Sequence, residues 1–269
     1  MTKPVKITYS SPEDRFLKSA LIQLLEYATG RAKLEKRLNK ILEGNPTEQT
    51  IWGDMLGGLN IPLDINWEMV DRIPKNGPLI LIANHPFGVV DGIAMAHIAT
   101  QIRPHFKALV NEVLCREQTI NSCFLPVDFR ETKEAMEINI STRNKAMEYL
   151  KQGGTIVIFP AGGVSTSPKI FKKAEDFEWK RFVVKLIEKT EATVVPIYFQ
   201  GQNSHLFQIA SLIHLNLRYG LLLNEVKNKM GKTLKAVIGE PIDKDLQKSL
   251  SRNDILPFLR ERVYSLARN

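Results

Sequence analysis

From Pro78 onward, short apolar runs alternate with stretches of helical periodicity, and this alternation restricts the fold more than any other feature of the chain. Each run is short and mostly apolar, as buried strands are. The runs lie at 78–84, 106–111, 124–129, 155–160, 192–199 and 234–242. Helical patterns lie between or after them at 91–102, 132–152, 175–190, 203–215 and 252–266. We therefore predict an α/β fold with a largely parallel sheet flanked by helices.

The N-terminal part of the chain has a different pattern, which is helical and basic. In residues 31–43, four apolar side chains share one face and five arginines and lysines lie around them. This pattern predicts either a helix that lies on anionic lipid or one that packs on the main domain with its basic face in solvent. Residues 44–78 are rich in Gly, Pro and Asn and predict connections with a short helix. We predict an N-terminal helical, membrane-surface segment over 1–70 and an α/β domain over 71–269.

The charge and the cysteines limit the class of partner. The 269 residues carry 37 Lys and Arg against 29 Asp and Glu, a formal net charge of +8, which predicts an anionic partner. No nucleic-acid-binding motif accompanies the lysines, so we expect no nucleic acid. Cys115 and Cys123 have no metal-ligand spacing, so we expect no metal and a reducing compartment. No apolar stretch resembles a signal peptide or a membrane span, which predicts a cytoplasmic protein.

One histidine and one aspartate border the first strand of the domain, in "IANHPFGVVDG" (82–92). His85 follows the apolar run and precedes proline, which favours an extended conformation at the mouth of the strand. Asp91 follows a turn at Gly88, and a strand-turn-helix path can bring its carboxylate back to the imidazole. The pair predicts a general base with its orienting carboxylate. The alternative, equally compatible with the residues, is that Asp91 only caps its helix.

Two later strands also end in polar, glycine-bearing segments: "IFPAGGVSTSP" (158–168) and "VVPIYFQGQNS" (194–204). Three such strand ends in one α/β domain predict a site, because the carboxyl ends of parallel strands meet at one edge. Two alternatives remain open. Ser165 could be the nucleophile of a lipid hydrolase, although the second glycine of a G-x-S-x-G elbow is missing. The chain could also be a membrane-surface lipid-binding module without catalysis.

The order of these blocks resembles the glycerolipid or lysophospholipid acyltransferases (1-acylglycerol-3-phosphate acyltransferase-like), in particular the bacterial hemolysin-like branch. The family has an Asn-His…Asp block, a second block, a Phe-Pro-Glu-Gly-Thr block and a later Val-Pro-Val segment. The matching residues are Asn84-His85 with Asp91-Gly92, residues 124–130, Phe159-Pro160-Ala161-Gly162-Gly163 and Val195-Pro196-Ile197. The likeness covers roughly residues 70 to 242.

The resemblance implies transfer of an acyl chain from a thioester, on coenzyme A or acyl carrier protein, to a hydroxyl of a lyso-lipid in membrane lipid synthesis. It implies His85 as the base, Asp91 as the residue that orients it, and no cofactor beyond the acyl-CoA or acyl-ACP co-substrate. It also implies a peripheral protein on the inner face of the membrane. The substrate-binding residues that it implies are Asn84, Gly88, Arg130, Phe159, Pro160, Gly162, Gly163 and Ser165.

The sequence departs from the family's pattern at two places. The spacer between His85 and Asp91 has five residues where four are usual, a feature that the hemolysin-like branch shares. In the third block, Ala161 stands where the family has glutamate, and Gly163-Val164 where it has threonine and arginine. Lysophosphatidic acid is therefore not implied as the acceptor, and an aminolipid or another lyso-lipid remains open.

Overall fold

The computed structural model describes residues 16–28, 30–111, 122–128, 130, 132–169 and 172–268, and this part of the chain forms a seven-stranded sheet. The strand order is β1-β7-β6-β2-β5-β3-β4, and every neighbouring pair is parallel except β6 with β7. The strands are β1 (Leu63–Asp64), β2 (Leu79–Ala83), β3 (Lys107–Asn111), β4 (Phe124–Val127), β5 (Thr155–Ile158), β6 (Thr193–Phe199) and β7 (Leu234–Ile238). The predicted α/β fold with a largely parallel sheet is confirmed.

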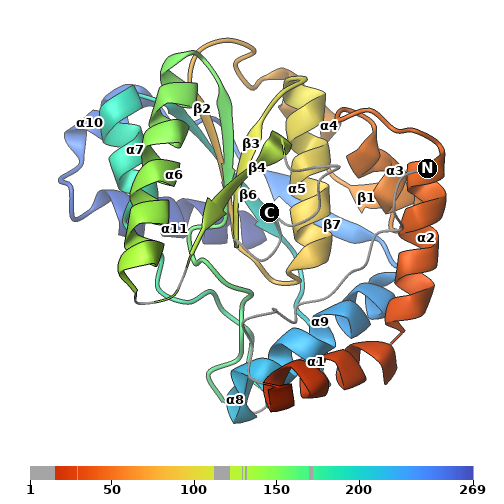
Figure 1. The fold of residues 1–269 in the computed structure, drawn as a ribbon. Helices are drawn as coiled ribbons and strands as arrows, with labels where there is room; N and C mark the ends of the chain where they lie inside the picture. Colours follow the sequence, from red (N-terminus) through yellow and green to blue (C-terminus); the bar gives the residue numbers. More distant parts are fainter. Residues whose placement is uncertain are drawn as a thin grey trace.

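Both faces of the sheet are covered by helices, as the apolar runs predict for buried parallel strands. β2 has every residue buried: Leu79, Leu81 and Ala83 pack in the hydrophobic cluster on one face, and Ile80 and Ile82 in the cluster on the other. The first cluster includes residues of α3 (Ile51–Gly58) and α5 (Val89–Ile102). The second includes residues of α6 (Lys133–Lys151), α7 (Phe182–Thr190) and α11 (Ile255–Ser265), and Figure 1 shows these layers.

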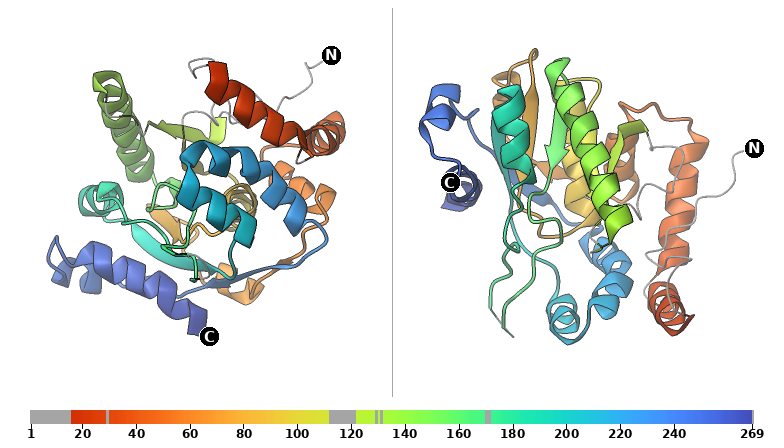
Figure 2. Two further views of the ribbon diagram at one scale, coloured as in Figure 1. Left: turned by 90° about the horizontal axis from the view of Figure 1, so that it is seen from below. Right: turned by 60° about the vertical axis from the view of Figure 1, so that its left-hand side comes forward.

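Three helices lie at one end of the sheet, the lower end in Figure 1. These are α1 (Phe16–Ala28), α8 (His205–Ile213) and α9 (Leu215–Lys229). Seen from below in Figure 2, α8 and α9 lie across the sheet, with α1 beside α9. Since the chain passes from the carboxyl end of β6 into α8, this is the edge at which the parallel strands end.

Two helices differ from the sequence prediction. The pattern at 175–190 gives a helix only from Phe182, because residues 175–181 form an irregular segment. The pattern at 203–215 gives α8, but a second helix follows directly. His214 takes an extended conformation (φ −162°, ψ 137°) that ends α8, and α9 then runs for 15 residues, of which only Leu215 lies in the predicted helix.

The basic helix predicted at 31–43 is α2 (Arg31–Glu43), and its apolar face is packed inside the protein. Leu34 is buried, and Leu38, Ile41 and Leu42 pack against the core cluster. Short elements follow it: α3, β1 and α4 (Trp67–Asp71), and β1 extends the sheet by pairing with β7. The division at residue 70 stays a prediction.

Exposed apolar side chains gather instead on α8. Leu206, Ile209, Leu212 and Ile213 are 37–68% exposed. A short α10 (Lys244–Ser249) and a final 3₁₀ turn (Leu266–Arg268) complete the fold. Among the described helices, none combines the length and apolarity that crossing a bilayer would require.

Candidate active site

Asn84, at the end of β2, continues the sheet with its side chain. Its Nδ2 donates to the Phe199 carbonyl at 2.9 Å, and its Oδ1 accepts from the Phe199 N–H at 2.7 Å. The residue is buried, and both the NH2 group and the oxygen of its side-chain amide bind the backbone of β6. Asn84 therefore holds two strand ends together, and the structure does not turn its amide toward a substrate.

His85 and Asp91 are brought together as the spacing predicts. The chain turns through Gly88, where φ is +87° and an added Cβ would lie 2.9 Å from the Val164 side chain. α5 then begins at Val89, and Asp91 lies in its first turn, completely buried. Asp91 Oδ1 lies 3.1 Å from His85 Nδ1. The turn needs glycine both for its backbone conformation and for its contact with the third block.

The two carboxylate oxygens of Asp91 contact different groups, one on the backbone and one on the imidazole. Oδ2 accepts a hydrogen bond from the Phe87 N–H at 2.8 Å, which satisfies a backbone donor before the helix as a cap does. Oδ1 faces the imidazole at an ion-pair distance of 3.1 Å from Nδ1, and in the described chain neither of these two buried atoms has a hydrogen-bond partner. The carboxylate thus fixes the ring through one nitrogen and leaves Nε2 for another group.

The ring of His85 is held from one side by Phe159. The two rings are stacked, with centroids 4.0 Å apart and planes 24° from parallel. The His85 side chain is 17% exposed, although Nδ1 itself is buried. Phe159 therefore orients the imidazole. Pro160, the next residue, lies in the turn, where its carbonyl accepts a hydrogen bond from the Lys180 N–H at 2.8 Å.

Asp176 is a buried carboxylate that the sequence analysis did not identify, and it holds the first and third blocks together through hydrogen bonds. Its Oδ1 accepts from the backbone N–H of His85 at 3.1 Å and from Ser165 Oγ at 2.5 Å. Its Oδ2 accepts from Trp179 Nε1 at 2.9 Å, and its own N–H donates to Tyr264 Oη at 3.0 Å. Burial and this carboxylate together raise the pKa of the Tyr264 phenol. Asp176 is therefore a positioning residue for the backbone of the first and third blocks.

Ser165 belongs to this support. It is buried, its hydroxyl is directed at Asp176, and its N–H donates to the His85 carbonyl at 2.8 Å. A serine nucleophile needs a base within hydrogen-bond reach of its oxygen. The contact of this oxygen is a carboxylate that already accepts two further hydrogen bonds, which is the arrangement of a structural serine.

The glycine turn of the third block is closed on itself. The Gly162 N–H donates to the Phe159 carbonyl at 3.0 Å, and φ of Gly162 is +67°. An added Cβ at Gly163 would lie 3.3 Å from Arg218 Nη2 and 3.3 Å from the Phe177 ring. Gly163 thus allows a guanidinium and an aromatic ring to approach the backbone, while the Gly162 N–H is already used inside the turn.

Helix α9 connects the three strand ends. Four of its side chains, spaced four, three and four residues apart, share one face and contact them in turn. Leu222 lies against Gly88, where an added Cβ would be 3.1 Å from it. Glu225 accepts from both the N–H (2.8 Å) and the hydroxyl (2.7 Å) of Ser204, which caps α8. Arg218 lies at the third block.

Lys229 is the fourth of these residues. Its Nζ lies 3.9 Å from the centroid of the Phe87 ring and 3.4 Å from the Gln202 carbonyl. Burial lowers the pKa of its ammonium, and the carboxylate of Glu225 opposes that effect. The Phe87 ring is therefore fixed in the wall of the site between a lysine and the backbone at Gly201, where an added Cβ would be 3.0 Å from it.

Arg130 lies apart from this group. It follows β4, which is separated from β2 by β5 and β3 in the sheet. Its guanidinium is held by Asp128, with Nη2 2.6 Å from Oδ2 and Nε 3.0 Å from the same oxygen. Neighbouring strands are about 4.8 Å apart, so Arg130 is on the correct edge of the sheet but far along it.

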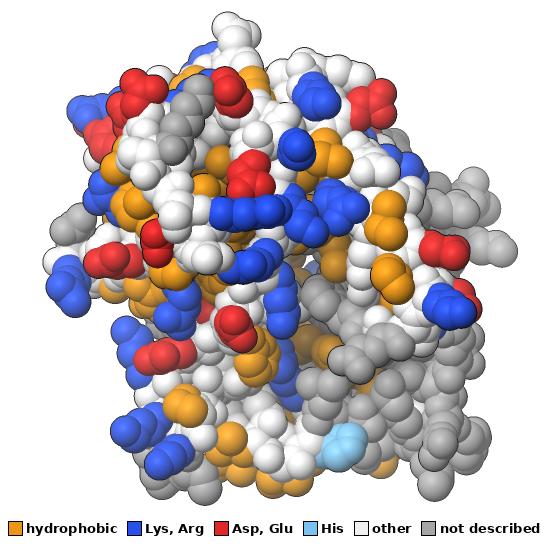
Figure 3. Space-filling model, turned by 90° about the vertical axis from the view of Figure 1, so that its left-hand side faces the viewer, with side chains coloured by type: hydrophobic (Ala, Val, Ile, Leu, Met, Phe, Trp, Pro, Cys, Tyr) orange, Lys and Arg blue, Asp and Glu red, His pale blue; other side chains and the backbone are white. Residues whose placement is uncertain are grey.

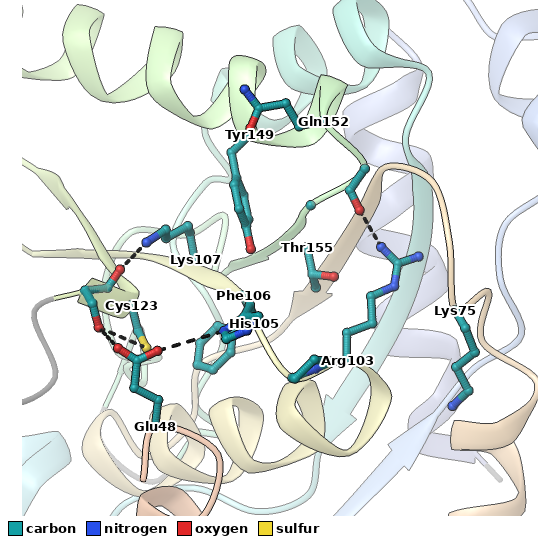
Figure 4. A pocket seen from close by; sticks show the side chains of 14 residues that line it. Glu48, Lys75, Arg103, His105, Phe106, Lys107, Cys123, Tyr149, Gln152 and Thr155 are labelled. Carbon is teal, nitrogen blue, oxygen red and sulfur yellow. Dashed lines mark hydrogen bonds and ion pairs between the residues drawn. The ribbon is translucent and has the colours of Figure 1, made fainter.

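The opposite edge of the sheet carries a cavity of about 490 Å³ (Figure 4). Phe106 and Lys107 at the start of β3, and Gly154 and Thr155 at the start of β5, contribute to its lining, which places it at the amino ends of the strands. None of the predicted site residues lines it. No group of three or more His, Cys, Asp or Glu suited to a metal occurs among the described residues.

Comparisons with known proteins agree with this architecture. The acyltransferase family model matches residues 62–269. Two lyso-glycine lipid O-acyltransferases, from Phocaeicola vulgatus and Bacteroides thetaiotaomicron, are 28% and 27% identical over 211 and 210 residues. Each match covers 73% of this chain, and 71% and 73% of the relatives.

The crystal structure of the 1-acyl-sn-glycerophosphate (LPA) acyltransferase PlsC from Thermotoga maritima is also similar. It aligns with a TM-score of 0.50 and 16% sequence identity, over 95% of this chain and 99% of that one. The likeness shows a shared fold, including the N-terminal helices and the sheet.

Proposed function

This chain belongs to the acyltransferase family, as its blocks predict, and from that premise we propose that it transfers an acyl chain from a thioester to a hydroxyl of a lyso-lipid. One observation carries the proposal: the 3.1 Å contact of His85 Nδ1 with Asp91 Oδ1 at the end of β2, with the ring stacked on Phe159. This arrangement leaves Nε2 as the nitrogen that can accept a proton.

In the proposed step, His85 Nε2 accepts the proton of the acceptor hydroxyl while the hydroxyl oxygen attacks the thioester carbonyl. Asp91 stabilises the imidazolium that forms. The carbon–sulfur bond then breaks, and the departing thiolate takes the proton from Nε2. The products are an ester and a free thiol, and the step needs no acyl-enzyme and no metal. Coenzyme A and acyl carrier protein are the donors that we propose to compare.

For the acceptor, the relatives supply the first candidate. The two curated relatives are lyso-glycine lipid O-acyltransferases, and this chain lacks the third-block glutamate, threonine and arginine of the phospholipid branch. We therefore propose a lyso-aminolipid, tested beside lysophosphatidic acid.

The test is release of free thiol from palmitoyl-CoA and palmitoyl-ACP in the presence of each lyso-lipid, with the lipid product identified by mass spectrometry. His85→Ala is expected to lose activity by about 10³-fold, the size of a general-base contribution. His105→Ala is the matched control, because that histidine is 71% exposed and lies at the other edge of the sheet. Full turnover in His85→Ala, or no ester product with any acceptor, would refute the proposal.

We further propose that the protein works on an anionic membrane surface, the inner face of the cytoplasmic membrane. The apolar side chains exposed on α8, which lies at the active-site end of the sheet, support this, together with the net charge of +8. Figure 3 shows lysines and arginines gathered across the middle of one side of the molecule. A docking surface beside the site would let a lyso-lipid reach His85 without leaving the membrane.

Flotation with vesicles tests the docking surface. Leu206→Ser with Ile213→Ser on α8 is expected to reduce binding to phosphatidylglycerol vesicles about tenfold, since two exposed side chains lose their burial in lipid. Leu246→Ser on α10, another exposed leucine, is the control and is expected to bind normally. Equal binding of all three proteins would exclude α8 as the docking surface.

A further inference from the structure

Among the described residues, Arg218 is a buried cation without a carboxylate partner. The residue is 6% exposed, and among the described residues its one side-chain hydrogen bond runs from Nη2 to the Val164 carbonyl at 2.9 Å. Its Nε is buried without a partner. The guanidinium lies 5.2 Å from the centroid of the Phe177 ring. A group with five N–H donors therefore has most of its hydrogen-bonding capacity unused.

Such an arrangement is unfavourable unless something else compensates it. Removing a charge from water costs free energy that a carboxylate partner usually offsets, and one carbonyl does not. Burial accordingly lowers the pKa of the Arg218 guanidinium, the Tyr219 phenol opposes this shift, and no carboxylate contributes to it. Arginine stays protonated even so. The molecule thus holds a positive charge that lacks a counter-ion in the described chain.

The position of Arg218 relates this charge to the reaction. Val164, which accepts its hydrogen bond, directly follows the glycine turn that begins at Phe159, the residue stacked on His85. One turn further along α9, Leu222 contacts Gly88 in the His85 block. Two neighbours of the guanidinium are Gly163, which has no side chain, and Phe177, which is 43% exposed.

We propose that Arg218 binds the anionic headgroup of the acceptor lyso-lipid, a carboxylate or a phosphate. The inference rests on the proposed function and specifies its substrate class. The third block of this chain has Val164 where the resembling family has arginine, and Arg218 brings a guanidinium to the same turn from α9. A planar guanidinium with free donors matches either anion through paired hydrogen bonds.

The kinetic test compares acceptors that differ only in headgroup charge. N-(3-hydroxypalmitoyl)glycine is compared with its methyl ester, and lysophosphatidic acid with monoacylglycerol, in wild type, Arg218→Gln and Arg218→Lys. Arg218→Gln is expected to raise KM for the acidic acceptor about 10- to 100-fold, with KM for the thioester unchanged. The neutral acceptors should lose little, and Arg218→Lys should recover part of the effect. Lys227→Gln, the same charge change at an exposed position of α9, is the control.

The outcomes separate cleanly. A larger effect on the glycine acid names a carboxylate headgroup, and a larger effect on lysophosphatidic acid names a phosphate. If Arg218→Gln weakens acidic and neutral acceptors equally, or leaves KM for the acidic acceptor unchanged, Arg218 is not the headgroup site. Thermal melting shows whether the variants fold. If Arg218→Gln does not fold, Arg218→Lys still tests the paired hydrogen bonds, because it keeps the positive charge.

A binding measurement separates this inference from the proposed function. Calorimetry with N-palmitoylglycine or lysophosphatidic acid, on protein carrying His85→Ala, needs no turnover. Loss of binding on adding Arg218→Gln supports the anion site even if no acyl transfer is found. Transfer to neutral lyso-lipids with no discrimination by Arg218 would uphold the acyltransferase and overturn the anion site.

Discussion

The two edges of the sheet each hold a buried arginine, and the two are satisfied very differently. At the amino edge, Arg103 donates to three carbonyls: Gly77 at 2.6 Å, Gly153 at 2.8 Å and Pro74 at 2.7 Å. At the carboxyl edge, Arg218 donates to one. Burial lowers the pKa of both guanidinium groups.

The number of satisfied donors separates a structural arginine from one that is available to a ligand. Arg103 ties together the loops that precede β2 and β5, so its hydrogen bonds close inside the protein. Arg218 leaves donors open beside Gly163, which has no side chain. Burial alone does not distinguish the two residues, whereas the count of satisfied donors does.

The largest effect at the carboxyl edge is expected from Asp91→Asn. The new carbonyl can still accept from the Phe87 N–H, but the amide would donate to His85 Nδ1 and leave the proton on Nε2. We expect kcat to fall by about 10²- to 10⁴-fold with little change in melting temperature. Asp91→Ala should also lose about 1 kcal/mol of stability, because the cap is removed. Retained turnover in Asp91→Asn would leave Asp91 with a capping role alone.

At the amino edge, Arg103→Met is expected to act on stability. Three carbonyls lose their donor, which should lower the free energy of unfolding by about 3 kcal/mol. KM for the acidic acceptor should be unchanged in the protein that remains folded. Urea unfolding and acceptor kinetics measured together test the contrast, and a selective rise in that KM would erase it.

Asp176→Asn tests whether a buried charge at the carboxyl edge can be structural as well. Three groups donate hydrogen bonds to the Asp176 carboxylate. The substitution replaces one of its two accepting oxygens with an NH2 group, which can only donate. We expect a loss of about 2 kcal/mol in the free energy of unfolding. The rate should fall with an unchanged pH profile, since the change moves the His85 backbone without altering the imidazole's partner. A shifted pH profile would instead assign Asp176 a part in the proton transfer.

The sequence predicts those parts of the site whose residues lie close together in the chain. The six apolar runs correspond to β2 to β7, and the signature is continuous in β2, β5 and β6 because these strands are buried on both faces. The His85–Asp91 contact follows from one strand, one turn and one helix that are adjacent in the chain. Gly88 and Gly163 also lie in the turns that the blocks indicate. Because these glycines have no side chain, Val164 packs close to Gly88 and Arg218 packs close to Gly163.

The residues that sequence reasoning missed have their partners far away in the chain. Asp176 contacts His85, 91 residues earlier, and Arg218 contacts Val164, 54 residues earlier. Asp176 lies in an irregular segment inside a stretch whose pattern predicts a helix. Arg218 lies on α9, whose run Leu221-Leu222-Leu223 and Gly220 obscure the helical period. The sequence contains one indication of Arg218: Val164 stands where the resembling family has arginine, so a cation for this turn has to come from another element.

Ser165→Ala is expected to have the smallest effect, and it completes the contrast within the third block. The hydroxyl donates to Asp176, so its removal should cost about 1.5 kcal/mol of stability, the low end of the range for one hydrogen bond to a charged group. Acyl transfer should stay within about threefold of wild type, because the backbone N–H of residue 165 still donates to His85 and the Arg218 contact with Val164 is untouched. A serine-directed phosphonate should fail to label the wild-type protein. Labelling that disappears in Ser165→Ala, together with loss of turnover, would make the serine a nucleophile and move the chemistry from His85 acting on an acceptor hydroxyl to a covalent route.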